Sequence, residues 1–564
     1  MLLLLVAVCL AAWFVPREGV WPFCSRLYTN ATFLTMNREN TIVDAVVSEC
    51  GQITYVGERD TAQRMAGWFT RTVDLQGGVV LPGFIDSHSH FPLAGLSEVV
   101  LDLSPPPGGH VDSLPVLYQR LKDHIQSDQG SGWVFGFNYD NTLFAEGRHP
   151  DRYALDAVSA ERPIFLRHSS GHMGVANSYG LALLGLLGDP SVAGNPLIRK
   201  YPGTFEPDGL LLESAAPNLR RFIQALSALE QWRFFRAGIQ QYASAGFTTV
   251  QAGGVDSRTA KLFHRLSGSR LLPLRIVVWP NEAAVFNIPD ATANTDSTEY
   301  FTLGPVKIYG DGSPQGYTAY LSEPYYQNLT EEDEYRGHPV KTDQQWKALL
   351  DSARLRGLSL AIHTNGDAAI DDVLAALDEQ VNKSRDFLQQ TRVILVHAQT
   401  MRLDQVKKAA RLGIETSFFV SHTFFWGDWH RSTALGPTRA EAISPLGWAR
   451  EHQLRFTLHT DAPVTPPSAL FLLWSATERL TRSGHLLGAE QRISRLDGLR
   501  ALTIDAALQA DLGRHRGSLE TGKAADMVVL SEDPLKAADL RSVEVVRTIV
   551  GGRTVFQREV TTPP

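Results

Sequence analysis

The sequence predicts an α/β protein: a (β/α)8 barrel of the TIM type with an inserted subdomain, and a small β-sandwich built from both chain ends. Three observations support this prediction. Apolar, strand-like segments alternate with helical patterns through the middle of the chain, as in parallel βα units. Both ends contain short segments rich in β-branched residues instead. The stretch between the first two expected barrel strands is far longer than a single connecting helix requires.

The length of the chain, 564 residues, predicts a large domain with a smaller accessory one. Hydrophobic residues make up 43% and charged residues 20%, which is typical of a globular protein and argues against long disordered stretches. The formal net charge is -7, and Lys and Arg form no run that would follow a phosphate backbone. We therefore expect no nucleic-acid partner.

Residues 1–20 are predicted to be a signal peptide or a signal anchor. An uninterrupted apolar run begins at Leu2, ends at Val15 and is followed by Pro16 and Arg17. The run has the length of a signal-peptide core and is shorter than the roughly 20 residues that usually span a bilayer. No Lys or Arg precedes it, so cleavage and retention as an anchor both stay open. We expect the secretory pathway, with the protein secreted or associated with a membrane through this segment.

Sequons and cysteines agree with that route. Three N-glycosylation sequons predict a glycoprotein; they begin at Asn30, Asn328 and Asn382. Of the three cysteines, Cys9 lies inside the apolar run. Cys24 and Cys50 either form one disulfide in an oxidising compartment or stay unpaired, and the sequence leaves both alternatives open.

The small β-sandwich is predicted to combine residues 21–80 with residues 515–564. Short alternating segments near the N-terminus are typical of strands joined by turns; they are Leu27–Met36, Ala45–Val47 and Ile53–Val56. The C-terminal end shows the same pattern at Asp526–Leu530, Val545–Val550 and Thr554–Phe556. Strands at both ends of a long middle region predict one domain assembled from the two termini.

Residues 81–514 are predicted to form the barrel. Its helices show apolar residues at helical spacing, as at Trp346, Leu350 and Ala353, and Gly357 then provides a C-cap. Eight strands are expected: VVLPGFID, GFTTVQAG, PLRIVVW, GPVKIYG, LSLAIH, RVILVH, IETSFFVSH and LRFTLHTD. The insertion, at about residues 95–240, has strand-like pieces of its own, and we expect it to cover the mouth of the barrel.

Histidines and acids lie at the ends of these strands. His88 and His90 are two residues apart and so share one side of an extended chain. The other candidates each end or nearly end a strand; they are Lys307, His363, His397 and Asp461. In a barrel, the C-terminal strand ends converge on one mouth, where active sites are built. These six residues are therefore expected to meet there.

The spacing of the candidates supports separate strands. His363 and His397 are 34 residues apart, close to one βα unit of roughly 30 residues. His397 and Asp461 are 64 residues apart, which fits two units. Each residue alone has a structural explanation: a lysine near a strand end usually reaches solvent, and an Asp before Ala-Pro often caps a turn. Together, in this order, they favour a metal site.

The motifs PGFIDSHSH, VKIYGDGSPQGYTA, AIHTNGDAAID, VHAQT and HTDAPV resemble those of the amidohydrolase superfamily. Within it, the chain is similar to the amidohydrolase-3, or YtcJ-like, branch over nearly its whole length after about residue 25. The closing segments GSLETGKAADMVVL and TIVGGRTVF and the opening ITYVG also match. The combination is far more specific than any single motif.

The resemblance implies a role for each of the six residues. His88 and His90 would bind the more buried divalent metal with Asp461, whereas His363 and His397 would bind a more exposed one. Lys307 would bridge both metals as a carbamate. An unmodified lysine, with a pKa near ~10.4, is a cation and cannot be a ligand. Zinc is the expected metal, with one or two ions.

The resemblance also implies a mechanism and its alternatives. Metal-activated hydroxide would attack a carbonyl carbon, and Asp461 would carry the proton to the leaving nitrogen. We thus expect a hydrolase that cleaves an amide, formamide, imide or N-acyl C–N bond of a small molecule. The alternatives are a deaminase or one-metal hydrolase of the same superfamily, or a non-catalytic binding or regulatory protein. The oligomeric state is open, with a homo-oligomer among the alternatives.

Four further residues are candidates for substrate contacts; they are His172, Asp311, His422 and Trp426. For each of them a purely structural role is an equal alternative. The chain also departs from the family pattern in two places. Val396 stands where many relatives have Glu, and Thr460, preceded by His459, stands where they often have Ser. Neither change removes a ligand, but both alter the surroundings of the expected metals.

Overall fold

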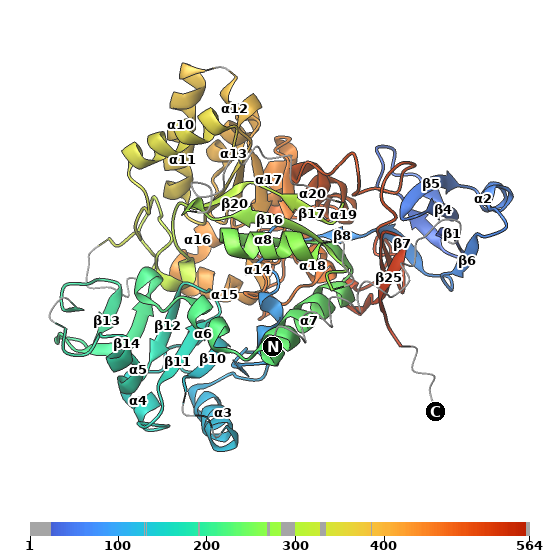
Figure 1. Cartoon of the computed structure of the whole chain (residues 1–564). Coiled ribbons are helices and arrows are strands. Elements are labelled where there is room, and N and C mark those ends of the chain that lie inside the picture. Colours follow the sequence, from blue (N-terminus) through green and yellow to red (C-terminus); the bar gives the residue numbers. More distant parts are fainter. Residues whose placement is uncertain are drawn as a thin grey trace.

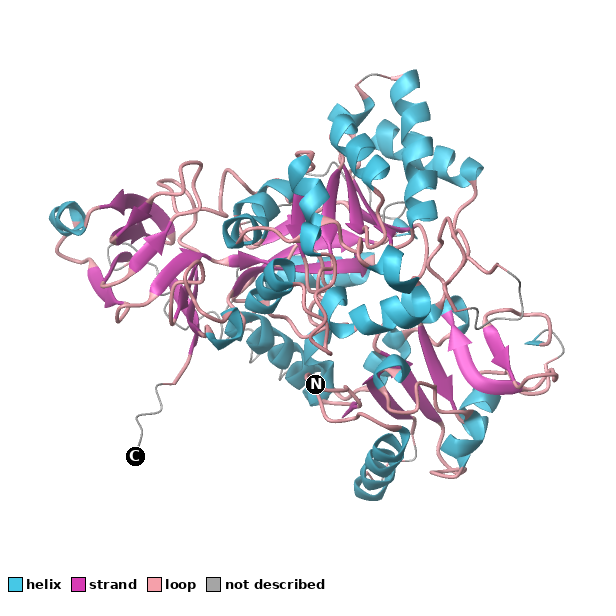
Figure 2. Ribbon diagram, turned by 180° about the vertical axis from the view of Figure 1, so that it is seen from behind, coloured by secondary structure: helices cyan, strands magenta, loops and turns pink. Residues whose placement is uncertain are grey.

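The computed structural model describes residues 24–559 except 129, 131, 190–191, 268–270, 284–298, 328–333 and 385. The predicted signal segment 1–20 and the sequon at Asn328 lie outside the described residues. Within the described part of the chain, no helix has both the length and the apolar character needed to cross a membrane. A central α/β body carries a β-rich lobe on one side and a second α/β lobe on another (Figures 1 and 2).

Two parallel ladders form the central body. The first has the order β17-β16-β15-β8; its strands are β8 (Phe84–Ile85), β15 (Phe247–Val255), β16 (Arg275–Pro280) and β17 (Phe301–Leu303). The second follows the chain from β18 to β22; its strands are β18 (Val306–Tyr309), β19 (Leu360–Thr364), β20 (Val393–His397), β21 (Glu415–Phe418) and β22 (Phe456–Leu458). A parallel bridge between Asn281 and Lys307 connects the two ladders.

The predicted α/β architecture with parallel strands is confirmed, whereas closure of the strands into a barrel stays a prediction. Strands form at all eight expected positions, but the first, VVLPGFID, is divided: β7 (Val79–Pro82) belongs to the sheet of the β-rich lobe, and only β8 joins the first ladder. β17 extends that ladder. Because every pairing within these ladders is parallel, the carboxyl ends of the strands in each ladder lie at one edge. That edge carries the predicted site residues.

Helices follow the strands as expected. The main ones are α7 (Ala228–Ser244), α8 (Ser257–Leu266), α10 (Asp343–Arg356), α11 (Asp367–Lys383), α13 (Leu403–Leu412) and α18 (Ala469–Glu478). In α10, the Thr342 side chain caps the N-terminus in a capping box with Gln345, and Gly357 ends the helix at φ 61°. The predicted apolar face of α10 is buried through Trp346 and Leu350, which confirms that interpretation.

The long stretch before β15 builds a mixed six-stranded sheet in the order β13-β14-β12-β11-β10-β9. Its strands are β9 (Leu101–Asp102), β10 (Val134–Tyr139), β11 (Ile164–His168), β12 (Met173–Ala176), β13 (Ile198–Lys200) and β14 (Pro207–Leu212). The sheet takes part in two hydrophobic clusters of its own, one that contains Leu166 and one that contains Phe165. It forms the lobe below the central body in Figure 1.

Two further sheets form the β-rich lobe. The first, β5-β4-β1-β6, comes from the N-terminal part alone: β1 (Ser25–Thr29), β4 (Ala45–Glu49), β5 (Gln52–Gly57) and β6 (Arg71–Asp74). The second, β25-β24-β23-β7-β2-β3, joins both chain ends: β2 (Thr32–Leu34), β3 (Ile42–Val43), β7 (Val79–Pro82), β23 (Met527–Leu530), β24 (Val545–Val550) and β25 (Arg553–Gln557). Cys24 and Cys50 form a disulfide, one of the two alternatives that the sequence left open.

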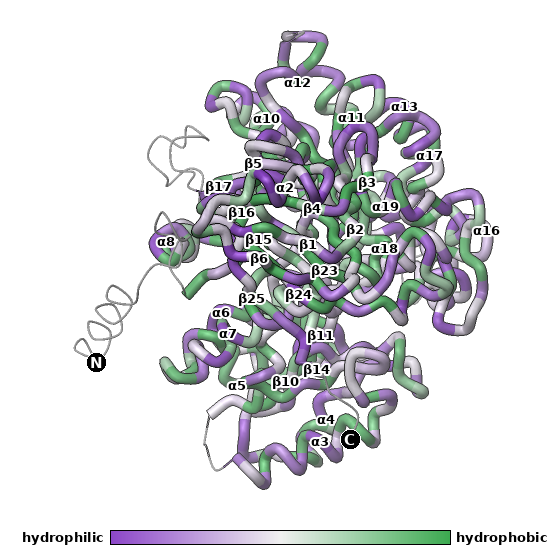
Figure 3. The backbone as a smooth tube through the Cα atoms, turned by 90° about the vertical axis from the view of Figure 1, so that its right-hand side faces the viewer, coloured by the Kyte–Doolittle hydropathy of each residue, from purple (hydrophilic) through white to green (hydrophobic). Residues whose placement is uncertain are grey.

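The lobe is fixed to the central body by buried polar contacts. The Arg275 guanidinium, on β16, donates from Nε to Asp526 Oδ2 at 2.7 Å and from Nη2 to Asp526 Oδ1 at 3.0 Å. Apolar residues concentrate along the interior strands, and hydrophilic ones along the outer helices (Figure 3). β7, the strand just before β8 and the predicted HxH motif, pairs with both β2 and β23, so the two chain ends support the start of the first ladder.

Candidate metal centre

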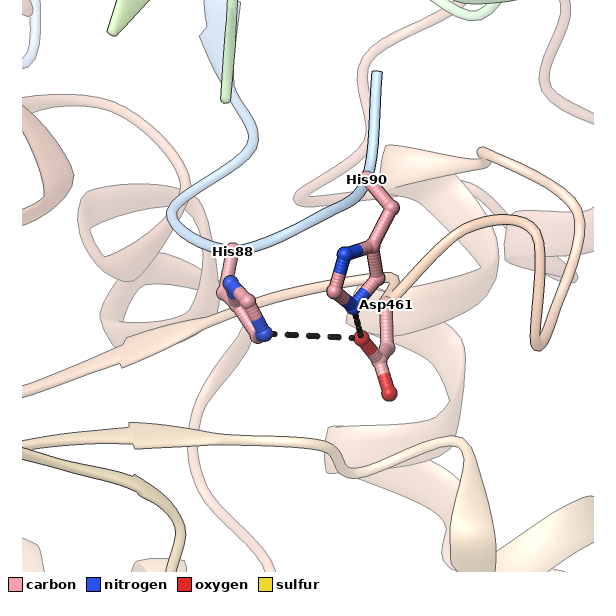
Figure 4. A group of neighbouring side chains, drawn as sticks. All are labelled: His88, His90 and Asp461. Atoms are coloured by element: carbon pink, nitrogen blue, oxygen red, sulfur yellow. Dashed lines mark ion pairs between the residues drawn. The ribbon is translucent and has the colours of Figure 1, made fainter. Parts of the chain in front are cut away.

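Three side chains meet at the carboxyl end of the parallel strands (Figure 4). His88 and His90 lie in the loop after β8, and Asp461 follows β22. His88 Nε2 is 3.5 Å and His90 Nε2 is 3.3 Å from Asp461 Oδ1. One ligand atom from each of the three residues lies within 4.8 Å of the others. This spacing suits one ion with nitrogen and oxygen ligands.

The strand β15 orients both imidazole rings from behind. Gln251 Oε1 lies 2.7 Å from His88 Nδ1, and the Gly253 carbonyl oxygen lies 3.2 Å from His90 Nδ1. Because a carbonyl oxygen only accepts, each Nδ1 carries the proton, and each Nε2 presents a lone pair towards Asp461. Burial, together with nearby Lys307, lowers the pKa of His88 well below its usual value, so that ring is neutral.

A buried oxygen of Asp461 indicates that the site suits a cation. Asp461 Oδ1 is buried and has no hydrogen-bond partner among the residues that the structure describes. Burial, the largest single influence, would raise the pKa of Asp461, but His90, His459 and Lys307 together outweigh it and lower the pKa, so the carboxylate is ionised at neutral pH. A carboxylate oxygen and two nitrogen lone pairs that face one another favour a positive ion between them.

Lys307 lies directly beside this group. Its Nζ is 3.0 Å from His88 Nε2, and its side chain is buried on β18. Burial lowers the pKa of Lys307 to about 7, so a large share of the amine is neutral at physiological pH. Only the neutral amine has the lone pair that reaction with carbon dioxide needs.

His363 and His397 form the neighbouring half of the site. Their ring centroids are 4.5 Å apart, and the His397 ring is 5.6 Å from that of His88. Behind His397, its Nδ1 lies 3.1 Å from His459 Nε2, and His459 Nδ1 lies 2.8 Å from the Ser417 hydroxyl. The six predicted ligands therefore lie in one cluster.

The backbone at two of these residues is strained. His397 has φ 72° and Asp461 has φ 52°, values that non-glycine residues rarely adopt. Each such position costs on the order of 1–3 kcal/mol and persists where the surroundings fix it. At Asp461 the fixing group is Asp86, which accepts from the Thr460 backbone N–H at 3.1 Å and from the Thr460 hydroxyl. Such strain is concentrated at functional sites.

The sequence comparisons agree with this geometry. The model of the Amidohydrolase family matches residues 71–556. The chain belongs to the amidohydrolase family. It is 28% identical over 544 residues to the N-substituted formamide deformylase of Arthrobacter pascens, covering 94% of this chain and 98% of that protein. It is 29% identical to the protein LONG AFTER FAR-RED 3 of Arabidopsis thaliana over 94% of this chain and 91% of that protein.

Two more relatives complete the comparison. The putative amidohydrolase YtcJ of Bacillus subtilis is 25% identical and covers 93% of this chain and 98% of its own length. A solved structure of an uncharacterized metal-dependent hydrolase from Pyrococcus horikoshii covers 92% of this chain and 99% of its own, with a TM-score of 0.72 at 22% identity, which shows the shared fold. The predicted family, and with it a hydrolase acting on carbon–nitrogen bonds, is confirmed.

Two of the predicted substrate contacts of this amidohydrolase lie on the side of His363. The His172 ring, from the insertion, is centred 5.4 Å from the His363 ring. His172 Nδ1 is 2.9 Å from Glu213 Oε2. Burial lowers the pKa of His172, but the negative charge of Glu213 raises it by more, so the pKa lies above its usual value. Asp311 instead holds the loop itself together: it accepts from three backbone N–H groups, those of Tyr320, Asn365 and Gly366.

The other two predicted contacts of the amidohydrolase lie on the side of His397. The His422 ring is centred 4.2 Å from Phe419, which in turn lies 6.2 Å from the His397 ring. Trp426 packs against His422 at 5.2 Å, and its indole N–H donates to Asp140 Oδ2 at 2.8 Å. Asp140 belongs to the insertion, so this bond joins the insertion to the wall of the site.

Sequence reasoning missed three supporting residues of the amidohydrolase site. Gln251 orients His88, Glu213 orients His172, and Trp279 stacks on the His88 ring at 5.0 Å and 8°. For Gln251 a signal was present, because it is the one amide at the end of an otherwise apolar or small strand, GFTTVQAG. Glu213 gave no such signal, since its partner lies 41 residues away.

Proposed function

We propose that this amidohydrolase hydrolyses a C–N bond of a small-molecule amide, formamide, imide or N-acyl compound, with a divalent metal held by His88, His90 and Asp461. The observation that carries the proposal is the convergence of three potential ligand atoms within 4.8 Å, one of them a buried carboxylate oxygen without a hydrogen-bond partner among the described residues. Zinc suits this set of nitrogen and oxygen ligands best.

A second metal would depend on Lys307. His363 and His397 supply two nitrogens that lie close together. Among the described residues, however, the one group of potential metal ligands is His88, His90 and Asp461, so these two histidines are not grouped with a carboxylate ligand. A carbamate on Lys307 would supply two anionic oxygens between the two halves of the site. Its position 3.0 Å from His88 Nε2 supports this role. The two-metal, carboxylated form is therefore our proposal, and the one-metal form with free Lys307 is the alternative.

The proposed division of labour follows from the positions of the side chains. When bound, the metal supplies Lewis acidity, which polarises the substrate carbonyl and lowers the pKa of water. Asp461, ionised and nearly buried, accepts the proton of the attacking water and returns it to the leaving nitrogen. With Nδ1 of His172 held by Glu213, its other ring nitrogen would contact the substrate. His422 and Trp426 form the other wall.

We also propose an overall architecture and a cellular location for the protein. The two ladders would be the two parts of one (β/α)8 barrel, with the insertion over its mouth and the β-sandwich beside it. The disulfide between Cys24 and Cys50 supports passage through an oxidising compartment, and exposed Asn30 and Asn382 are open to glycosylation. Together with the apolar run after Met1, these features support a secreted or membrane-anchored glycoprotein.

The test is a hydrolysis screen over N-substituted formamides, N-acyl amino acids and cyclic amides, with metal content measured on the same samples. Formamides come first because one relative is named a formamide deformylase. Asp461→Asn should abolish turnover, whereas Asp378→Asn, on the outer helix α11 and paired with Lys408, should not. Undiminished activity of Asp461→Asn would contradict the mechanism.

Each alternative predicts a distinct result. Ammonia released from an amino-substituted heterocycle, without amide hydrolysis, would indicate a deaminase. One metal per chain with an unmodified Lys307 in native mass spectrometry would indicate the one-metal form. Protein that holds no divalent metal, and gains no activity when metal is added, would indicate a binding or regulatory protein.

A further inference from the structure

A fully exposed tryptophan lies at the outer end of the β-rich lobe. The turn between α2 (Arg59–Met65) and β6 exposes Trp68 at 102% and Phe69 at 58% of the full side-chain surface. Met65, just before the turn, is also exposed. Figure 1 shows α2 at the edge of the lobe that faces away from the central body. Adjacent large apolar side chains at such a tip favour an interaction with another surface.

The turn presents these aromatic residues on ordered backbone. Thr70 N donates to the Gly67 carbonyl oxygen at 2.9 Å, which closes a turn with Trp68 at its centre. The Thr70 hydroxyl contacts that of Ser25 at 2.9 Å and so ties the turn to β1. Central turn positions are usually occupied by Gly, Pro, Asn, Asp or Ser. Turn formation therefore does not explain the tryptophan, and its complete exposure excludes packing within the lobe.

The described chain begins beside the same turn, at Cys24, only a short distance in sequence after the apolar N-terminal run. The run ends at Val15, and eight residues separate it from Cys24, the residue before Ser25. Eight residues span at most about 30 Å. A bilayer that holds the run therefore lies within this distance of Ser25 and the adjoining turn.

The charges around the turn suit a lipid surface. Arg26 of β1 and Arg71 of β6 are direct neighbours in the parallel pairing beside the turn. Arg64 lies in the last turn of α2, next to Met65, whereas Asp60 lies at the far end of that helix. Tryptophan favours the interface between lipid and water, and arginine is attracted to anionic headgroups.

We propose that the Met65–Phe69 turn is a membrane-contact site that inserts Trp68 into the headgroup region of a bilayer, beside the N-terminal apolar run. The turn thus adds a second point of contact, which limits the rotation of the lobe on the membrane surface. The inference is independent of the hydrolase activity, because none of its residues belongs to the metal centre.

The experiment uses the full chain with Cys9→Ser, so that no free thiol remains beside the Cys24–Cys50 disulfide. Trp68→Cys is labelled with the environment-sensitive dye NBD and bound to phosphatidylcholine–phosphatidylserine vesicles. Its matched control is Phe205→Cys, which replaces another exposed aromatic residue, in the insertion. We expect a several-fold rise in fluorescence and quenching by spin-labelled lipid for the dye at position 68 only.

A second measurement guards against disturbance of the turn by the dye. The label is moved to Met65→Cys, with Trp68 either kept or replaced by serine. We expect quenching by spin-labelled lipid to fall several-fold in the serine form. Equal access of aqueous iodide to the dyes at positions 68 and 205 on vesicles, or no association of the full chain with vesicles, would overturn the proposal.

Discussion

Replacing Gln251 with leucine tests whether the metal centre depends on the strand behind it. Gln251 Oε1 accepts from His88 Nδ1 at 2.7 Å and from the Ser89 backbone N–H at 3.0 Å, and both donors are buried. Leucine accepts neither bond. The His88 ring would then lose the contact that fixes its proton on Nδ1 and directs Nε2 towards Asp461.

The magnitude follows from these two bonds. Each buried donor left without an acceptor costs about 1–3 kcal/mol, so Gln251→Leu should lower the free energy of unfolding by roughly 2–6 kcal/mol. Loss of a group that orients a metal-binding histidine lowers metal affinity ~10–100-fold. In free energy this equals about 1.4–2.7 kcal/mol. Gln251→Glu keeps both acceptor positions and should retain the affinity.

The assay is competition for zinc with a chromophoric chelator, with thermal unfolding of the metal-free proteins measured in parallel. The unfolding measurement separates a weakened site from a weakened fold. The expected order of zinc affinity is the native protein, close to Gln251→Glu, and then Gln251→Leu. A folded Gln251→Leu protein that binds zinc as tightly as the native one would refute the reasoning.

Three further outcomes are expected. Asp526→Asn removes the buried counter-charge of the Arg275 guanidinium, leaving only the more exposed Glu299, and should destabilise the protein by about 3–5 kcal/mol at pH 7 in urea unfolding. Although burial opposes it, Arg275 lowers the pKa of Asp526, so this pair stabilises the fold fully above the unfolded pKa of ~3.9. The difference between the two proteins should shrink as the pH falls below that value and vanish once the pH has passed the lower pKa of folded Asp526. Trp426→Phe removes the donor to buried Asp140 and should raise KM more than it lowers kcat; an unchanged KM would contradict a role for this bond in shaping the substrate wall. Lys307→Gln should reduce the metal content to one ion per chain by elemental analysis, and two retained ions would contradict the bridging role.

The candidate metal-binding side chains could be found from the sequence because strand ends can be located from local patterns. His363 and His397 end their strands in LSLAIH and RVILVH, and the structure places them there, at the ends of β19 and β20. Parallel strands then bring such ends together whatever the loops contain. Lys307 departs from this rule: it is the second residue of β18, and its long side chain brings Nζ to 3.0 Å from His88 Nε2.

What the sequence could not predict depends on contacts between distant segments. Asp311 was a candidate for substrate contact, but its three backbone partners come from loops whose paths have no sequence signature. The disulfide between Cys24 and Cys50 required knowledge that β1 and β4 are neighbours. The insertion is joined to the central body by contacts such as the Trp426–Asp140 bond, whose residues lie 286 positions apart.

The placement of β7 has a consequence for how the enzyme is made. This strand runs directly into β8 and the His88–His90 loop, and β23 pairs along it with Val529 opposite Val80. On the ribosome, β7 can pair with β2 as soon as both have emerged, but it lacks β23 until nearly the whole polypeptide has been synthesised. Chains cut short before Met527 would lack this support for the metal-binding loop. We therefore expect metal to bind only after β23 has been synthesised, and chains truncated before Met527 to contain no bound metal.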